Sequence, residues 1–156
     1  MTRRHLLAWV VLIAVLDAGC GVRPTGVITG RPAPTGAVEG ATLYFLANSS
    51  LTMVRRTTHQ HLSPTQTLVL LQAGPNPDDR AENLTSEVPT GLDPVTVAID
   101  ASGNVDVVVS ADVTTLSTNA VDQIVCTVRD ALFTTAPITL TSKAATRGPR
   151  ICPLTA

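Results

Sequence analysis

This sequence has few aromatic side chains and almost no excess of positive or negative charge. Only 3% of its 156 residues are aromatic, and the formal net charge is −1. Binding to nucleic acid usually needs a basic surface for the phosphates or aromatic rings on which bases stack. We therefore expect no nucleic-acid partner. Hydrophobic residues make up 44% of the chain, which is enough for the core of one domain.

Sequence motifs for catalysis are also missing. The chain contains no Gly-x-Ser-x-Gly, no phosphate-binding Gly-rich loop and no His-Glu-x-x-His. His59 and His61 would share one face of a strand, but no third metal ligand is near them in sequence, and an exposed loop before a helix is the simpler interpretation. Asp78 and Asp79 are adjacent, so they project differently and are interpreted as solvated loop charges. We expect no enzymatic activity, no metal site and no cofactor.

The chain has one long apolar run, which is too short for a stable membrane span. Residues 6–16 are apolar, whereas a spanning helix needs about 20 such residues. Arg3 and Arg4 precede the run and Asp17 ends it, which is typical of an export signal. Paired arginines also occur in signals for export of folded proteins, and the sequence leaves both export routes open.

A cysteine follows this signal directly. Ala18 and Gly19 are small residues suited to a cleavage site, and Cys20 comes next. The arrangement resembles the lipobox of bacterial lipoproteins, in which a diacylglycerol is attached to the cysteine and the chain is cut before it. The resemblance implies cleavage between Gly19 and Cys20 and a lipid anchor on Cys20, although Asp17 stands where the lipobox usually has an aliphatic residue. The alternative is an ordinary secretory signal followed by an unrelated cysteine.

The remaining chain reads as a tether, one domain and a tail. We divide the sequence into a signal peptide (1–19), a lipidated cysteine with a flexible Pro/Gly-rich tether (20–40), a globular domain (41–144) and a tail (145–156). Local patterns predict strands over 41–48, 51–58, 95–100, 105–110 and 137–144, one helix from Pro64 to Gly74, and one over 117–132. The connection 76–94 is expected to be irregular. This ββαββαβ order predicts a compact α+β domain with two helices on one mainly antiparallel sheet.

The second helix is predicted to be amphipathic. Its apolar residues recur at steps of three and four, which leaves Asp122, Arg129 and Asp130 on the solvent side.

Two further cysteines, Cys126 and Cys152, remain once Cys20 is assigned to the anchor. In an exported chain we expect them to form a disulfide, because the compartment is oxidising. The bond would attach the tail to the second helix. The alternative is a buried free thiol at Cys126 and an exposed one at Cys152.

A known family shares the pattern of residues 68–89. The stretch "LVLLQAGPNPDDRAENLTSEVP" resembles the GerMN domain of sporulation and spore-germination proteins, with a Leu-rich helix ending in Gly-Pro, a charged connector and a Leu-Thr/Ser-x-x-Pro turn. The strand motif "LYFL" (43–46), the hairpin of residues 95–110 and the helix motif "DQIVCTV" (122–128) extend the resemblance over residues 41–142. It implies a compact α+β domain without characteristic catalytic residues, and lipid-anchored versions in actinobacteria. The cysteine-containing tail departs from the family pattern.

These observations predict a lipoprotein on the extracytoplasmic face of the cell membrane. Its domain is expected to be a non-catalytic binding or assembly module for an envelope protein partner, using sheet edges and the connection 76–94 as contact surfaces. One alternative is a cell-wall or lipid hydrolase with an unrecognised site around His59 and His61. Another is a carrier of a small ligand, which needs an enclosed apolar cavity.

Overall fold

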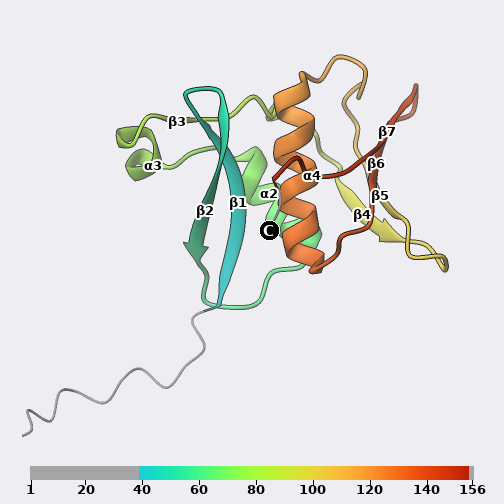
Figure 1. Ribbon diagram of the computed structural model, residues 1–156, viewed down its shortest axis with the longest axis horizontal. Helices are drawn as coiled ribbons and strands as arrows, with labels where there is room; N and C mark the ends of the chain where they lie inside the picture. The colour runs from blue at the N-terminus through green and yellow to red at the C-terminus, as the bar shows by residue number, and fades with distance from the viewer. Residues whose placement is uncertain (1–38, 155–156) are drawn as a thin grey trace, which may run out of the picture. The chain divides into compact units, whose positions relative to one another are not determined.

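The computed structural model describes residues 39–154, which form one domain (Figure 1). Its elements are β1 (Gly40–Ala47), β2 (Ser50–Thr57), α2 (Pro64–Gln72), α3 (Pro77–Ala81), β3 (Leu84–Thr85), β4 (Thr96–Ile99), β5 (Val105–Val108), α4 (Thr118–Leu132), β6 (Ile138–Thr141) and β7 (Thr146–Arg150). The expected signal peptide, its cleavage site at Gly19 and Cys20, and the lipidation of Cys20 lie outside the described residues, as does nearly all of the tether. Between residues 39 and 154, no helix has both the length and the apolar character to cross a membrane.

The α+β class is confirmed, but the expectation of a single sheet is wrong. Strands β2-β1-β3 form one sheet and strands β4-β5-β6-β7 form another. All strand pairs are antiparallel except β5 with β6, which is parallel. Helix α4 lies between the two sheets, so the two hairpins never pair with each other (Figure 1).

Local signals in the sequence account for the first hairpin and the first helix. Asn48 and Ser49 have φ values of 49° and 64°, as expected of a two-residue turn whose backbone twist matches that of the flanking strands. Ser63 caps α2 by accepting from the Gln66 N–H, and the Gln66 side chain accepts from the Ser63 N–H, which completes a capping box. Gly74, with φ of 78°, follows the end of the helix.

Helix α4 is buried more completely than its amphipathic pattern predicted. Every residue from 120 to 128 is buried, because β1 and helix α2 pack against α4 and the second sheet lies on its other side. Asp122 is therefore not on a solvent side: it is 6% exposed and accepts hydrogen bonds from the guanidinium of Arg150 on β7. A carboxylate on this covered surface is stabilised because it is paired with a charged donor.

The connection and the tail are more ordered than expected. Residues 76–94 contain α3 and β3, and Asp79 is buried rather than solvated, because it caps α3 and forms an ion pair with Arg56 of β2. Asp78 is exposed, as expected. The segment after residue 145 is not a separate tail, since residues 146–150 pair with β6 as the outer strand β7.

Candidate functional site

A groove of about 660 Å³ opens on the surface of the domain. Five segments line it: the start of β1, Arg55 of β2, the region from His61 to Thr67, the C-terminal end of α4 with the residues that follow it (129–135), and residues 151–154 after β7. Its apolar lining comes from Ala41, Leu62, Ala131, Phe133, Ile151 and Leu154. Small-molecule and peptide sites commonly combine such an apolar lining with a few polar groups.

Phe133 stands at the rim of this groove in an unfavourable conformation. It is the C-cap of α4 and has φ of 50° and ψ of 41°, a left-handed conformation in which helices usually place glycine. Its side chain is 90% exposed, whereas the other aromatic residues of the domain, Tyr44 and Phe45, are buried. Both the backbone strain and the exposed ring cost stability, and such residues are often retained for function.

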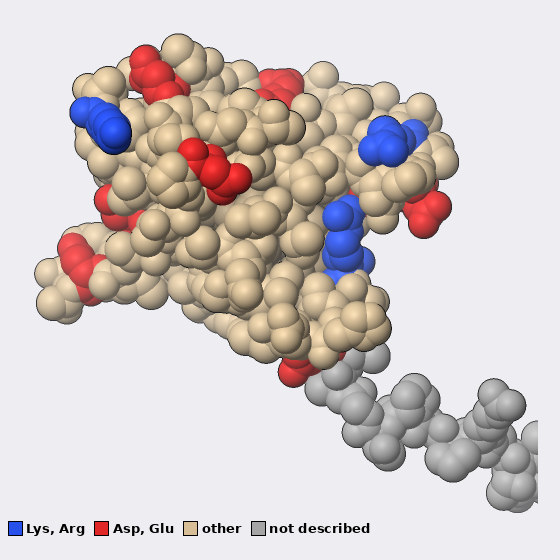
Figure 2. All heavy atoms as spheres, turned by 180° about the vertical axis from the view of Figure 1, so that it is seen from behind, with Lys and Arg blue, Asp and Glu red and all other residues tan. Residues whose placement is uncertain are grey.

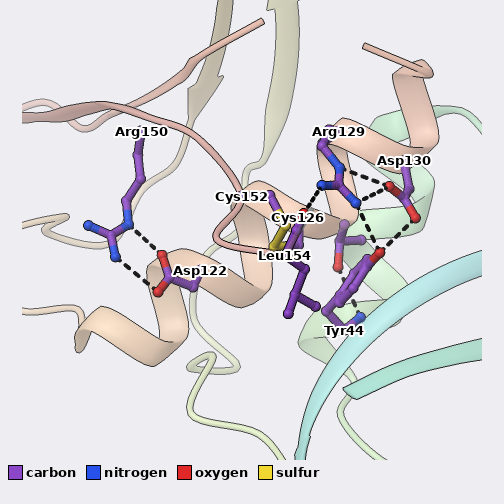
Figure 3. The surroundings of a disulfide bond; sticks show 9 residues. Tyr44, Asp122, Cys126, Arg129, Asp130, Arg150, Cys152 and Leu154 are labelled. Carbon is purple, nitrogen blue, oxygen red and sulfur yellow. Dashed lines mark hydrogen bonds and ion pairs between the residues drawn. A yellow bond between two sulfur atoms is a disulfide. The ribbon is translucent and has the colours of Figure 1, made fainter. Parts of the chain in front are cut away.

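A disulfide bond holds the part of the groove lining that follows β7. Cys126 of α4 and Cys152 are bonded, with their Cα atoms 4.8 Å apart, which is the pair expected from the sequence (Figure 3). The Arg129 guanidinium donates to the Leu154 carbonyl oxygen at 2.6 Å. These two attachments hold Ile151, which is 64% exposed, and Leu154 beside the end of α4.

Tyr44, Arg129 and Asp130 form a polar cluster near the disulfide, and Arg129 and Asp130 also line the groove (Figure 3). The Tyr44 hydroxyl donates to Asp130 Oδ2 at 2.9 Å, and Arg129 Nη2 donates to the Tyr44 hydroxyl at 3.2 Å and to Asp130 Oδ1 at 2.9 Å. Burial is the largest cause that raises the pKa of Tyr44, and the hydrogen bond to Asp130 raises it further. Arg129 partly opposes this shift. Arg129 and Asp130 form an ion pair, so their opposite charges largely cancel, and Arg55 is the further charged residue in the groove lining.

The Tyr44 hydroxyl is expected to titrate above its ordinary pKa of 10.0. Tyr44 is the only tyrosine in the chain, so phenolate absorbance follows this group alone. Because the folded state holds the proton more tightly than the unfolded chain, the associated stability is present below pH 10 and lost as pH rises through the folded pKa. Denaturant unfolding on either side of this pKa measures the loss.

The Asp130→Asn variant is the control for the Tyr44 titration. It removes a group that raises the pKa, so the phenolate midpoint should move towards 10.0. An unchanged midpoint would contradict the assignment of Asp130 as a cause of the shift.

The two histidines suggested by the sequence do not form a joint site. Both are exposed in the loop before α2, and only His61 is part of the groove lining. Within residues 39–154, no three His, Cys, Asp or Glu side chains are arranged to hold a metal ion. On the face turned away from the view of Figure 1, charged side chains are few and scattered, without a continuous patch of either sign (Figure 2).

Sequence reasoning missed Phe133 and the Tyr44 cluster. A sequence does not reveal that a phenylalanine stays exposed, because exposure depends on which segments pack around it. A weak signal was available, since the predicted helix ends at Leu132 without the glycine that usually follows a helix.

One buried glutamine connects three separate parts of the fold. Gln123 Nε2 donates to the Tyr44 carbonyl oxygen at 2.9 Å and to Ser86 Oγ at 3.3 Å, while its Oε1 accepts from the Glu87 N–H at 2.9 Å. Thr127 Oγ1 accepts from the Tyr44 N–H at 3.2 Å. Strand β3 pairs with only two residues of β1, so no strand covers the β1 edge at Tyr44. The side chains of Gln123 and Thr127 therefore provide the hydrogen-bond partners of the Tyr44 backbone there.

The segments that meet at Gln123 also carry the GerMN resemblance: the strand with "LYFL", the turn at 84–89 and the helix with "DQIVCTV". The model of the Germane family, described as sporulation and spore germination, matches residues 42–142. The chain belongs to the Germane (GerMN) family. This membership relates its function to sporulation and germination. Comparison with curated proteins and with solved structures gives no match.

Part of the groove lies outside the GerMN match. The matched range ends at residue 142, so residues 151–154 lie beyond it. Phe133 and the end of α4 lie within the matched range. The groove therefore combines a surface of the GerMN domain with a wall that the disulfide adds to it.

Proposed function

We propose that this protein is a cell-envelope lipoprotein, anchored through Cys20 on the extracytoplasmic face of the membrane. Its GerMN domain is a non-catalytic module that binds an envelope protein partner. The groove beside Phe133 is the contact surface. The export signal followed by Ala18, Gly19 and Cys20 supports the anchor, and the family supports a role in sporulation or germination.

The exposed ring of Phe133 is the single observation that carries the binding role. Protein interfaces usually depend on a few large side chains, often aromatic, that enter a pocket of the partner. Phe133 and Ile151 present large apolar groups on the rim of one groove, where both are mostly exposed. A partner that covers them would gain roughly 1.5–3 kcal/mol for each side chain fully removed from water.

The Phe133→Gly variant is expected to lose the partner while remaining folded. Glycine adopts the left-handed conformation without strain, so the free energy of unfolding should stay within about 1 kcal/mol of the wild-type value or rise. Crosslinking in intact cells, followed by mass spectrometry of the co-purified proteins, measures the loss of the partner. Denaturant unfolding measures the stability.

Val69→Ser is the matched control for the Phe133 variant. Val69 is an exposed apolar residue of α2, 46% accessible and outside the groove, so its replacement should leave the captured partner unchanged. A Cys20→Ala variant tests the anchor separately, by loss of fatty-acid labelling and of membrane association. Equal capture by wild type and Phe133→Gly would contradict the proposed contact surface without bearing on the anchor.

A further inference from the structure

Strand β2 forms a sheet edge unlike the others in the described part of the chain. It has eight residues, none of them proline or glycine, and its register with β1 is unbroken from Ser50 to Thr57. The other three sheet edges are short or interrupted: β3 has two residues, β4 has four, and β7 contains Pro149 and a register shift. Proteins usually protect long regular edges, because such edges pair with other strands.

The hairpin geometry shows which backbone groups of β2 are unpaired. Ala47 and Ser50 flank the two-residue turn and exchange backbone hydrogen bonds, and the pairing alternates from there along both strands. The bond from the Thr58 N–H to the Glu39 carbonyl oxygen, at 3.0 Å, fits this alternation. The N–H and C=O groups that point away from β1 therefore belong to Leu51, Met53, Arg55 and Thr57.

This edge is accessible in the domain. Strand β2 lies on the side of β1 that faces away from α4, and no strand between residues 39 and 154 pairs with its outer side (Figure 1). The side chain of Met53, at the middle of the strand, is 61% exposed. Both the backbone groups and an apolar side chain are thus available to an added strand.

We propose that β2 pairs in antiparallel orientation with β2 of a second copy of this chain, around a two-fold axis at Val54. The two three-stranded sheets then become one six-stranded sheet. Its outer strands are the two copies of β3, which has only two residues, so the assembly closes as a dimer. This interface shares Arg55 with the groove lining but does not include Phe133 or Ile151, and it does not depend on the proposed anchor.

The two-fold register at Val54 is favoured by hydrogen bonding and by charge. It pairs Leu51 with Thr57 and Met53 with Arg55 of the other copy, so all four outward-facing residues of each strand are bonded. Moving the axis to Arg55 would place the two guanidinium groups opposite each other, and like charges in that position are destabilising. Moving it to Met53 would leave Thr57 unpaired. The charge pattern of the strand thus fits a second copy in one register.

Cysteine crosslinking of the full-length chain in membranes tests the dimer and its register. When Met53→Cys and Arg55→Cys chains are co-expressed and an oxidant is added, a disulfide-linked heterodimer is expected, because directly paired Cα atoms lie about 5.5 Å apart, within disulfide range. Chains carrying only one of these substitutions should crosslink to themselves much less. No crosslink, equal crosslinking in the single variants, or a crosslink to a different protein would overturn the proposal.

Opposite charges at residue 53 provide a second test that does not need a crosslink. Met53→Glu places a carboxylate opposite Arg55 of the other copy, whereas Met53→Lys places a like charge there. By symmetry each substitution acts twice, so Glu should tighten and Lys should weaken dimerisation by about 2- to 30-fold each. Sedimentation of the full-length protein in detergent measures the association. Equal weakening by both variants would overturn the register, and a wild-type protein that stays monomeric would overturn the dimer itself.

Discussion

The Gln123→Met variant is expected to lose about 3 kcal/mol of unfolding free energy, because the substitution removes every hydrogen bond of a fully buried side chain. Methionine has a similar length, so the effect comes from lost polar contacts more than from lost volume. The Tyr44 carbonyl oxygen and the Glu87 N–H would lose their Gln123 partner. Leaving a buried polar backbone group unsatisfied costs about 1–3 kcal/mol.

The position of Gln123 makes this effect large. Its side chain occupies the edge of β1 that β3 leaves uncovered, and at the same time holds the turn at Ser86 and Glu87. A substitution therefore weakens the contacts among β1, α4 and the connection to β3 together. Denaturant unfolding measures the loss, with Gln60→Met in the exposed loop before α2 as a control that should change stability little.

A loss smaller than about 1 kcal/mol would contradict this assignment. It would mean that other groups or water satisfy the edge of β1 without Gln123. The Thr127→Val variant offers an independent check, because it removes only the acceptor for the Tyr44 N–H and should have a smaller effect in the same direction.

Removal of the disulfide between Cys126 and Cys152 is expected to lower the free energy of unfolding by about 3 kcal/mol. The two residues are 26 positions apart, and a crosslink that closes a loop of this size restricts the unfolded chain by roughly that amount in the chain-entropy model. The Cys126→Ala/Cys152→Ala variant and the reduced wild-type protein should unfold at similar denaturant concentrations, both well below that of the oxidised protein.

The same variant should change the groove more than the core. Without the disulfide, residues 151–154 would be held to α4 only by the hydrogen bond from Arg129 to the Leu154 carbonyl oxygen. We expect faster hydrogen exchange in this segment, while β1 and α4 remain protected. Equal stability of oxidised and reduced protein would contradict the stabilising role of the bond.

Much of the local structure was predictable because its signals lie within a few residues of each other. Ser63 and Pro64 mark the start of α2, and Asn48 and Ser49 adopt the positive φ values of a tight hairpin turn. Capping and turn formation depend on backbone groups two to four residues away, so they can be recognised without knowledge of the fold.

The arrangement of the sheets, and the burial and ion-pair partners of the charged residues, were not predictable in this way. The pattern of α4 indicated one buried face, but a helix between two sheets is buried on more than one side. Asp122 is therefore covered, and its charge is paired with Arg150 of a distant strand. Asp79 likewise is paired with Arg56, 23 residues away. Such partners are brought together only when the whole chain is packed.

The sequence by itself therefore determined the class of the domain, its family, most of its helices and strands, and the cysteine pair. These properties follow from short-range periodicity, capping and composition. Only the tertiary structure decided that the hairpins form separate sheets, that Gln123 completes the edge of β1, and that Phe133 stays exposed beside a groove. Each of these outcomes depends on packing between distant segments, because burial and hydrogen-bond partners are properties of neighbours in space.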